Sequence, residues 1–460
     1  MRYAGKKATV IGLARSGFAA AKYLLAHKAR VRVTESSTKR QALESAEYLR
    51  GLGADVETGG HTEAYVTGSQ FVVTSPGIPR KSLPLVWAAR KHIPVISEIE
   101  LAWRDCPGRI VGITGSNGKT TTSHLVHRLL GEAGRPSVLC GNVGYSFVEA
   151  LPGITRRSVV VLELSSFQLE DSPQFRPEIA VVLNLSPNHL DRHGTLRRYA
   201  QAKENIFRNQ SANDAVVLNA DDPIVRAMSR RARGQVVFFS KKPLSRGAYL
   251  EGDQAWWRDR SGRRALWRVQ DLRLQGAHNI ENALAASAVA MLLGVPRTAL
   301  ERALRSFRTL DHRIEPVGEI SGIRFVNDSK STTVASTRAA IEAVEGPIVL
   351  IAGGRDKGVD YVGIEPDLER KVRSAVLYGE AAPKIAASWK RYANYVIVKD
   401  FADAVRVAHR SAVTGDAVLL SPMCTSYDQF GSFEERGEAF RTVVQQLRSL
   451  SPEAGTGGGT

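Results

Sequence analysis

Short apolar runs alternate with amphipathic stretches along most of this chain. Val159–Leu162 and Ile348–Ala352 consist of aliphatic residues alone. Runs of this kind are typical of strands that a parallel sheet buries on both faces. Other stretches predict helices, such as the alanine-rich segment 279–293, which is followed by Gly294 and Pro296. The alternation predicts an α/β fold with mostly parallel sheets.

The same pattern gives the expected position of each element. Strands are expected at 7–13, 31–34, 71–75, 94–97, 110–113, 159–164, 180–185, 215–219, 236–239, 323–326, 348–352, 374–378, 395–398 and 417–421. Helices are expected at 18–26, 121–130, 279–293 and 433–450, with a turn at 12–17. Residues 241–275 carry Trp256, Trp257 and Trp267 among turns and short alternating runs, which predicts a small antiparallel patch.

A chain of 460 residues is too long for one hydrophobic core, and about three domains are expected. A turn signal at 105–108 follows the first series of strands and helices, and a new series starts near residue 310. We therefore expect domains at 1–99, 100–309 and 310–447. The low-complexity end of the chain, 448–460, is expected to be a disordered tail.

Composition places the chain among ordinary globular proteins, with 43% hydrophobic and 24% charged residues. No apolar run approaches the roughly 20 residues that cross a bilayer, and the first residues do not resemble a secretory signal. Cys106, Cys140 and Cys424 form neither a disulfide framework nor a zinc pattern. These observations predict a cytoplasmic protein without membrane insertion.

The formal net charge of +17 makes a nucleic-acid partner an alternative to be weighed. The arginines are spread along the chain, however, and the densest clusters, at 230–233 and 258–264, carry no RNA- or DNA-binding motif. We expect no nucleic-acid partner. Most of the excess charge is attributed to a solvated surface that helps to bind anionic substrates.

The most specific motif is a phosphate loop at residues 112–120. Gly112, Gly118, Lys119 and Thr120 match the pattern G-x-x-x-x-G-K-[ST] between a predicted strand and a predicted helix. The glycines let backbone N–H groups turn towards phosphate oxygens, the lysine adds a charge, and the threonine hydroxyl can hold Mg²⁺. The expected ATP-binding residues here are Gly115, Ser116, Asn117, Gly118, Lys119, Thr120 and Thr121.

Polar residues at the ends of other strands are further candidates. Glu163 ends an apolar strand, where a carboxylate can hold Mg²⁺ beside a phosphate loop. His189, in a turn after another strand, can ligate a metal ion or make only a hydrogen bond. Lys203 lies in a helical stretch and, on sequence alone, would be an ordinary surface lysine.

An asparagine pair and an arginine leave two interpretations open. Asn279 and Asn282 share one face in the first turn of their helix, where they can cap the helix or bind a nucleotide. Arg313 opens the third series of elements and is either an arginine finger or a surface residue.

Three polar loops, at 327–332, 353–358 and 421–430, each follow a predicted strand. Open α/β sheets bind their ligands at the carboxyl ends of parallel strands, although such loops are also normal connections. Lys330 and Lys357 in these loops favour an anionic substrate group.

Together these motifs resemble the Mur ligases of bacterial peptidoglycan synthesis, over nearly the whole chain to about residue 447. The most specific segments are Glu163–Leu169, Asn188–His193, Asn327–Lys330, Asp428–Phe430 and Phe433–Gly437. Within the family, these segments are most similar to those of the ligases that add D-glutamate to UDP-N-acetylmuramoyl-L-alanine. The phosphate loop alone would not distinguish these ligases from other members of the family.

The resemblance implies a Rossmann-like domain for the UDP group at 1–99, a central ATPase at 100–309, and a Rossmann-like domain for the incoming amino acid at 310–447. It implies small-molecule substrates, ATP, two Mg²⁺ sites and a carbamylated Lys203. We expect a monomer.

The resemblance also implies a role for each matching residue. The catalytic residues would be Lys119, His189, Lys203 and Arg313. The metal ligands would be Thr120, Glu163, His189 and carbamylated Lys203. Nucleotide contacts outside the phosphate loop would come from Asn279, Asn282, Arg313 and Asp328. The UDP-sugar substrate would be held by Ala14, Arg15, Ser16, Glu35, Ser36, Asn142 and His189, and D-glutamate by Lys330, Thr332, Lys357, Ser426 and Phe433.

Two segments depart from familiar patterns. Residues 12–17 lack the G-x-G-x-x-G spacing, so a dinucleotide cofactor is not supported. Residues 331–333 read Ser-Thr-Thr where the family usually has Ala-Thr-Asn.

The implied reaction is ATP-driven amide bond formation through an acyl phosphate. Another Mur-type ligase and folylpolyglutamate synthase are close alternatives, which the segments Phe167–Leu169 and Asp428–Phe430 disfavour. A phosphate-loop ATPase that acts on nucleic acid is an alternative of a different class. No helicase-type or base-stacking motif supports it.

Overall fold

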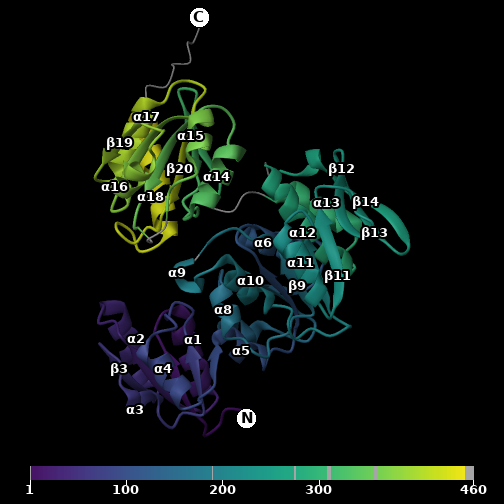
Figure 1. Ribbon diagram of the computed structural model, residues 1–460, viewed down its shortest axis with the longest axis vertical. Coiled ribbons are helices and arrows are strands. Elements are labelled where there is room, and N and C mark those ends of the chain that lie inside the picture. Colours follow the sequence, from purple (N-terminus) through teal and green to yellow (C-terminus); the bar gives the residue numbers. More distant parts are fainter. Residues whose placement is uncertain (1, 189, 274–275, 308–311, 357–359, 451–460) are drawn as a thin grey trace, which may run out of the picture. The chain divides into compact units, whose positions relative to one another are not determined.

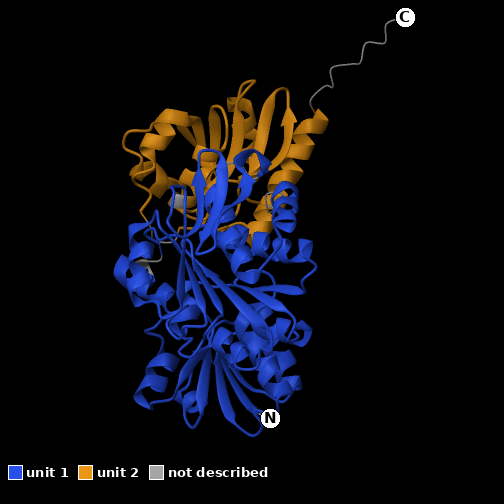
Figure 2. Ribbon diagram, turned by 90° about the vertical axis from the view of Figure 1, so that its right-hand side faces the viewer, with its two compact units in different colours: residues 1–273, 279–307 blue, residues 274–278, 308–460 orange. Residues whose placement is uncertain are grey.

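The computed structural model describes residues 2–188, 190–273, 276–307, 312–356 and 360–450. The chain divides into two compact units, residues 1–273 with 279–307 and residues 274–278 with 308–460 (Figure 2). The first unit contains two sheets and the second unit contains one. The expected domain boundaries at 99 and 309 stay predictions.

The first sheet has five parallel strands in the order β3-β2-β1-β4-β5. The strands are β1 (Lys7–Ile11), β2 (Arg30–Glu35), β3 (Asp55–Thr58), β4 (Phe71–Thr74) and β5 (Val95–Ser97). The helices are α1 (Arg15–Ala26), α2 (Arg40–Gly51), α3 (Glu63–Val66), α4 (Leu83–Arg90) and α5 (Glu98–Trp103). The order of the strands reverses next to β1, and in such sheets ligands bind where the order reverses.

The start of α1 corrects one prediction. The strand was expected to reach residue 13 and a turn to fill 12–17, but β1 ends at Ile11 and α1 begins at Arg15. The helix starts this early because Gly17 has no side chain. A Cβ atom there would lie 1.9 Å from the Gly12 carbonyl oxygen, so only glycine lets α1 pack this closely on the turn.

The second sheet has nine strands in the order β14-β13-β12-β11-β10-β9-β6-β8-β7. The strands are β6 (Arg109–Thr114), β7 (Ser137–Gly141), β8 (Val159–Glu163), β9 (Ile179–Val182), β10 (Ala215–Asn219), β11 (Gln235–Ser240), β12 (Gly247–Glu251), β13 (Gln254–Asp259) and β14 (Gly262–Arg268). The strands β12, β13 and β14 pair antiparallel, which confirms the patch predicted from the tryptophans. The remaining pairs are parallel.

Most helices of this middle part lie between its strands in the chain, and α12 and α13 follow its last strand. The α-helices are α6 (Lys119–Glu132), α7 (Phe147–Ala150), α8 (Ser166–Glu170), α9 (Leu190–His193), α10 (Leu196–Glu204), α11 (Pro223–Met228), α12 (Ala277–Leu293) and α13 (Arg297–Ser306). Short 3₁₀ turns are η1 (Leu151–Gly153), η2 (Ser229–Arg231) and η3 (Val269–Asp271).

The third sheet has six strands in the order β15-β16-β20-β17-β18-β19, of which only β15 is antiparallel to its neighbour. The strands are β15 (Glu315–Ile320), β16 (Ile323–Asn327), β17 (Ile348–Gly353), β18 (Val372–Tyr378), β19 (Tyr395–Val398) and β20 (Ala417–Met423). The helices are α14 (Val334–Ala343), α15 (Glu365–Lys371), α16 (Ala382–Ser388), α17 (Phe401–Ser411) and α18 (Phe433–Leu450). Helix α18 runs three residues past the expected domain end at 447, and the rest of the expected tail lies outside the described residues.

Helices cover both faces of this third sheet (Figure 1). Leu350 belongs to a buried cluster with residues of α14, α15 and α16, and its neighbour Ile351 belongs to one with residues of α17 and α18. Alternate residues of a strand point to opposite faces, so a continuous apolar run is what a doubly covered strand needs.

The predicted fold class, α/β with mostly parallel sheets and an antiparallel patch, is confirmed. Within the described ranges, no helix combines the length and the apolar character needed to cross a membrane.

Candidate functional site

The phosphate loop connects the carboxyl end of β6 to the N-terminus of α6. Gly118 has a φ of 81°, and a Cβ atom there would lie 2.2 Å from Asn282 Oδ1. At Gly115 a Cβ atom would lie 2.9 Å from the Leu183 side chain. Helix α6 has no side-chain cap at Gly118. Its first backbone N–H groups can therefore hold an anion.

Side chains of the loop turn inward. Lys119 Nζ donates to the carbonyl oxygens of Gly115, at 2.9 Å, and Ser116, at 3.0 Å. Asn184 Oδ1 accepts a hydrogen bond from the backbone N–H of Asn117 at 2.8 Å. These contacts hold the loop in a curled form. Thr120 and Thr121 are buried in the first turn of α6.

Lys203 is buried beside this loop, with 1% of its surface exposed, and is not the surface residue that its sequence context predicts. Its Nζ donates to the Gly115 carbonyl at 2.8 Å and to Thr114 Oγ1 at 3.3 Å, and lies 4.7 Å from the centre of the Tyr199 ring. Burial and the charge of Lys119 lower the pKa of Lys203 well below its ordinary value, against an opposing effect of Glu163.

Glu163 ends β8, which lies next to β6 in the sheet. Its Oε1 accepts a hydrogen bond from Asn142 Nδ2 at 2.9 Å. Its Oε2 is buried and has no hydrogen-bond partner among the described residues. A carboxylate oxygen buried in this way is costly unless a cation compensates it.

The asparagine pair of α12 contacts the phosphate-loop helix. Asn282 Oδ1 accepts a hydrogen bond from Thr122 Oγ1 at 3.2 Å, and its Nδ2 donates to Asn279 Oδ1 at 3.1 Å. Both asparagines are buried. The pair thus links α12 to α6, and Asn282 lies against Gly118.

In the first sheet, the residues expected at the UDP group lie after β1 and β2. Ala14 and Arg15 are exposed at the start of α1, whose N-terminus has no side-chain cap. Glu35, at the end of β2, accepts hydrogen bonds from the backbone N–H of Leu13 at 2.6 Å and of Ser37 at 2.7 Å. Its carboxylate joins the two loops that carry Ala14 to Ser16 and Ser36.

A charged cluster in the first unit was missed by the sequence reasoning. The carboxylate of Glu170, in α8, contacts Arg80, Arg192 and His193 at 3.0 to 3.2 Å. Burial raises the pKa of Glu170, but the His193 hydrogen bond and the two arginines outweigh it and bring it to about 2. Arg192 also donates to the Ile78 carbonyl, so the cluster ties the first sheet's loops to the middle part. The motif Asn188–His193 could have indicated the cluster, because it contains Arg192 and His193.

The three polar loops of the second unit follow β16, β17 and β20, which are adjacent strands in the order β16-β20-β17. Lys330 Nζ lies 5.3 Å from the centre of the Phe433 ring, and Ser329 Oγ donates to the Phe433 carbonyl at 2.8 Å. The structure therefore brings Lys330 and Phe433 together. Thr332 follows Lys330 in the same loop, and Ser426 is buried after β20.

Asp328 is buried at the end of β16 and lies near Arg313. Its carboxylate accepts hydrogen bonds from Ser421 Oγ at 2.8 Å and from the Ile314 N–H at 3.2 Å. Burial raises the pKa of Asp328 to about 6, although hydrogen bonds and the charge of Arg313 oppose this. The two residues expected at the nucleotide therefore interact with each other.

Arg436 is a second residue that the sequence reasoning did not single out. It is fully buried in α18 and donates to the Ser329 carbonyl at 2.7 Å, to Ser329 Oγ at 2.9 Å and to the Cys424 carbonyl at 3.2 Å. It thereby joins the loops after β16 and β20. Helical spacing gives the signal, because Arg436 falls within the stripe of Phe433, Gly437 and Phe440 that faces the sheet.

Two expected site residues, His189 and Lys357, lie outside the described residues. In the described part of the chain, no group of three or more His, Cys, Asp or Glu side chains could hold a metal ion. Of the expected metal ligands, Thr120, Glu163 and Lys203 lie in the described part of the chain, and Glu163 is the one that carries a carboxylate.

Comparisons with known families cover most of the chain. Residues 6–97 match the family described as Mur ligase MurD-like, N-terminal domain. Residues 113–290 match the Mur ligase middle domain, and residues 312–424 match the Mur ligase glutamate ligase domain.

Curated relatives match over almost their full length. A protein of Koribacter versatilis named UDP-N-acetylmuramoylalanine–D-glutamate ligase is 40% identical over 96% of this chain and 98% of its own. The protein of the same name from Symbiobacterium thermophilum is 42% identical over 96% of this chain and 98% of its own.

Solved structures share the fold at low sequence identity. The UDP-N-acetylmuramate–alanine ligase MurC of Thermotoga maritima has a TM-score of 0.60 at 20% identity, covering 96% of this chain and 99% of that one. The MurF ligase of the same organism, solved in complex with ADP, has a TM-score of 0.59 at 17% identity, covering 91% and 96%. These likenesses concern the fold alone.

Proposed function

The chain belongs to the Mur ligase family, and we propose that it joins D-glutamate to UDP-N-acetylmuramoyl-L-alanine in an ATP-dependent reaction. The observation that carries the proposal is the pairing of a phosphate loop with the buried residues Lys203 and Glu163. The names of the relatives support the choice of substrates. We further propose that the chain acts as a cytoplasmic monomer on small molecules.

The residues around the phosphate loop fit Mg²⁺. The unpartnered Oε2 of Glu163 is buried, and the Thr120 hydroxyl lies in the first turn of α6. We propose that these two oxygens hold one ion, and that carbamylated Lys203 and His189 hold a second. When bound, Mg²⁺ would neutralise the negative charge of the phosphates.

Lys203 fits a carbamylated ligand. An amine must be unprotonated to attack CO₂, and the lowered pKa of Lys203 favours that form. In the attack, the Nζ–C bond forms, the amine loses a proton, and the neutral side chain becomes an anion. A carboxylate-like group at this position would compensate the charge of Lys119 and give a metal ion an oxygen ligand.

Substrate contacts divide between the parts of the chain. We propose that Ala14 and the first residues of α1, Arg15 and Ser16, hold the UDP group together with Glu35 and Ser36, and that Asn142 contacts the sugar. Lys330, Thr332, Lys357, Ser426 and Phe433 hold D-glutamate, whose two carboxylates suit the lysines. Asn279, Asn282, Arg313 and Asp328 contact the nucleotide.

We propose the following reaction. A carboxylate oxygen of UDP-N-acetylmuramoyl-L-alanine attacks the γ-phosphorus of ATP, and the bond to the ADP oxygen breaks. Lys119 and Arg313 stabilise the negative charge on the transferred group. The amine of D-glutamate then attacks the acyl carbon, phosphate leaves with the former carboxylate oxygen, and the nitrogen loses a proton. An amide, ADP and phosphate result.

The deciding experiment follows that oxygen. UDP-N-acetylmuramoyl-L-alanine labelled with ¹⁸O in its carboxylate is incubated with ATP and D-glutamate, and the released phosphate is analysed by mass spectrometry. We expect one ¹⁸O atom per phosphate. Phosphate without the label would rule out the acyl phosphate. ADP release that does not depend on D-glutamate would rule out the ligase assignment. A panel with L-glutamate and D-isoglutamine tests the closest alternatives.

A matched pair of variants tests the phosphate loop in the same assay. Lys119→Met removes the charge that the loop holds inward, and we expect ADP release to fall by about 10²- to 10³-fold. Lys242→Met removes an exposed lysine from the same unit and is expected to keep wild-type activity.

A further inference from the structure

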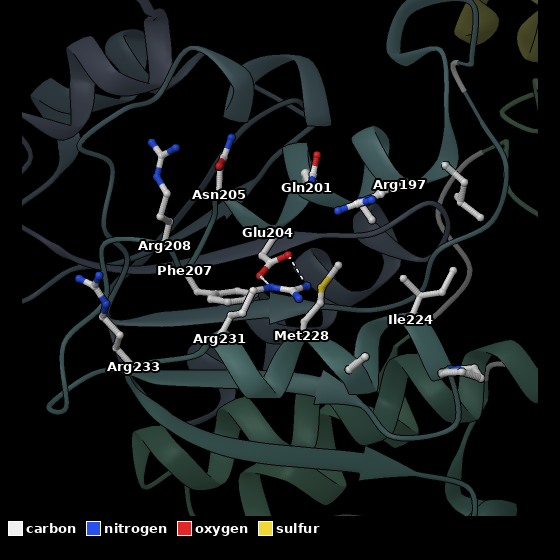
Figure 3. A pocket seen from close by; sticks show the side chains of 14 residues that line it. Arg197, Gln201, Glu204, Asn205, Phe207, Arg208, Ile224, Met228, Arg231 and Arg233 are labelled. Carbon is white, nitrogen blue, oxygen red and sulfur yellow. Dashed lines mark hydrogen bonds and ion pairs between the residues drawn. The ribbon is translucent and has the colours of Figure 1, made fainter.

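A hollow of about 1000 Å³ lies between α10 and α11, and none of the residues that line it has a role in the proposed reaction (Figure 3). Ala200, Phe207 and Met228 are buried at its floor, and Leu196 and Ile224 also line it. The volume is at the upper end of the range of small-molecule sites. The lining is mostly apolar, so the hollow suits a ligand with an apolar body.

Arginines surround this apolar floor. Arg197, Arg208, Arg231 and Arg233 line the hollow, against a single carboxylate, Glu204. Glu204 is already paired with Arg231, whose Nη2 lies 2.7 Å from its Oε2 (Figure 3). Arg197 and Arg233 make no ion pair within the described part of the chain, and both are exposed. The hollow therefore carries a clear excess of positive charge, with guanidinium groups available to an anion.

Helix α10 contributes both to the hollow and to the proposed catalytic site. Leu196, Ala200 and Glu204 face the hollow at a spacing of four residues. Lys203 and Tyr199 are not among the lining residues, and Lys203 contacts the phosphate loop instead. The hollow is thus a separate site, although a ligand in it would touch the helix that positions Lys203.

We propose that this hollow binds a small amphipathic anion, an alkyl chain that carries a phosphate or carboxylate group. The charge on the rim selects an anion, and the apolar floor requires the chain. An inorganic anion would leave the floor in contact with water, and a cationic amphiphile would meet the arginines. The inference goes beyond the proposed ligase reaction and does not depend on it.

Binding is tested by isothermal titration calorimetry with octyl phosphate below its micellar concentration. The full-length protein is first saturated with ADP, so that the phosphate loop is occupied. We expect octyl phosphate to bind about 10- to 100-fold more tightly than butyl phosphate, because four more methylene groups are buried. Equal binding by inorganic phosphate or by octyltrimethylammonium would overturn the proposal, because the site would then recognise only one half of the ligand.

Variants locate the site. Arg233→Glu reverses a charge on the rim, and Ile224→Asp replaces an apolar contact at an exposed position, so both proteins are expected to fold. We expect the Kd for octyl phosphate to rise about fivefold or more in each. Arg230→Glu is the matched control, because this exposed arginine of the same turn does not line the hollow, and its Kd should stay within about twofold. A Kd that Arg233→Glu and Ile224→Asp leave unchanged would contradict the proposed site.

Discussion

A buried ammonium group near another cation is energetically unfavourable. The Nζ atom of Lys203 is in that situation, because it is buried against Thr114 and Gly115 and lies near the charge of Lys119. The position is tolerable if the side chain is neutral or carries a negative group. We therefore expect the protein in ¹³C-bicarbonate to show a carbamate carbonyl signal by NMR. Lys203→Arg should lose that signal, because a guanidinium does not form a carbamate. An identical signal in the variant would assign it to another amine.

Glu98 makes stability depend on pH. It is buried at the start of α5 and accepts a hydrogen bond from the Val148 N–H at 2.6 Å, and burial raises its pKa to about 7. A carboxyl whose pKa is raised on folding contributes stability below its unfolded value of 4.5, and this contribution is lost as the pH rises through about 7. Glu98→Gln removes that loss and keeps an acceptor for Val148.

We therefore expect Glu98→Gln to match the wild-type melting temperature near pH 4.5 and to exceed it by about 2–6 °C at pH 8.5. Differential scanning calorimetry across this range measures the difference. Glu47→Gln, at an exposed position of α2, makes the same change in charge and should show no such trend. A difference that did not grow with pH would mean that Glu98 is ionised throughout.

At the scale of elements, α6 has one glycine that its backbone geometry requires, at its N-cap, and another near its end that could be replaced. Gly118 has a positive φ, and its missing Cβ leaves room for Asn282 Oδ1. Gly131, near the end of the same helix, has no atom within 4 Å of where its Cβ would lie. We expect Gly118→Ala to weaken ADP binding at least about tenfold and to destabilise the protein by roughly 1–2 kcal/mol. Gly131→Ala should stabilise it by about 0.5–1 kcal/mol.

Calorimetric titration with ADP and thermal unfolding of the two alanine variants check these effects. Wild-type ADP affinity in Gly118→Ala would show that the loop can move away from α12, and that the contact with Asn282 is dispensable.

Elements were predictable where both faces of a strand are buried. The apolar runs 159–162 and 348–352 lie in β8 and β17, each covered on both sides, so the pattern alone was sufficient. The strands β3 and β15 were not predicted, because they are edge strands with polar residues. Chain order also could not show that β20 lies between β16 and β17, which is what brings the three polar loops together.

The site was predictable in its motifs and less so in its contacts. The phosphate loop, Glu163 and the asparagine pair each have a local signal. The burial of Lys203 has no local sequence signal. Most of the surface of α10 is polar, and the lysine is buried by residues that are about 90 positions away in the chain. Tertiary packing of this kind cannot be derived from a single helical segment.

At the scale of the whole molecule, the chain has a net charge of +17, and its substrates are all anions. Long-range attraction of this kind raises association rates and is screened by salt, with a Debye length of about 10 Å at 0.1 M. We therefore expect kcat/KM for ATP and for the UDP-sugar to fall about 3- to 10-fold between 20 and 300 mM KCl. The value of kcat at saturation should change little, because screening acts on the encounter with the substrates and not on the bound complex.

Steady-state kinetics at fixed free Mg²⁺ measure this, with the melting temperature at each salt concentration as the control for stability. A constant kcat/KM would mean that the positive charge is only a solvated surface. A fall in kcat of the same size would place the effect of salt on groups that contact the reacting phosphate, such as Lys119, since only those act after the substrates have bound.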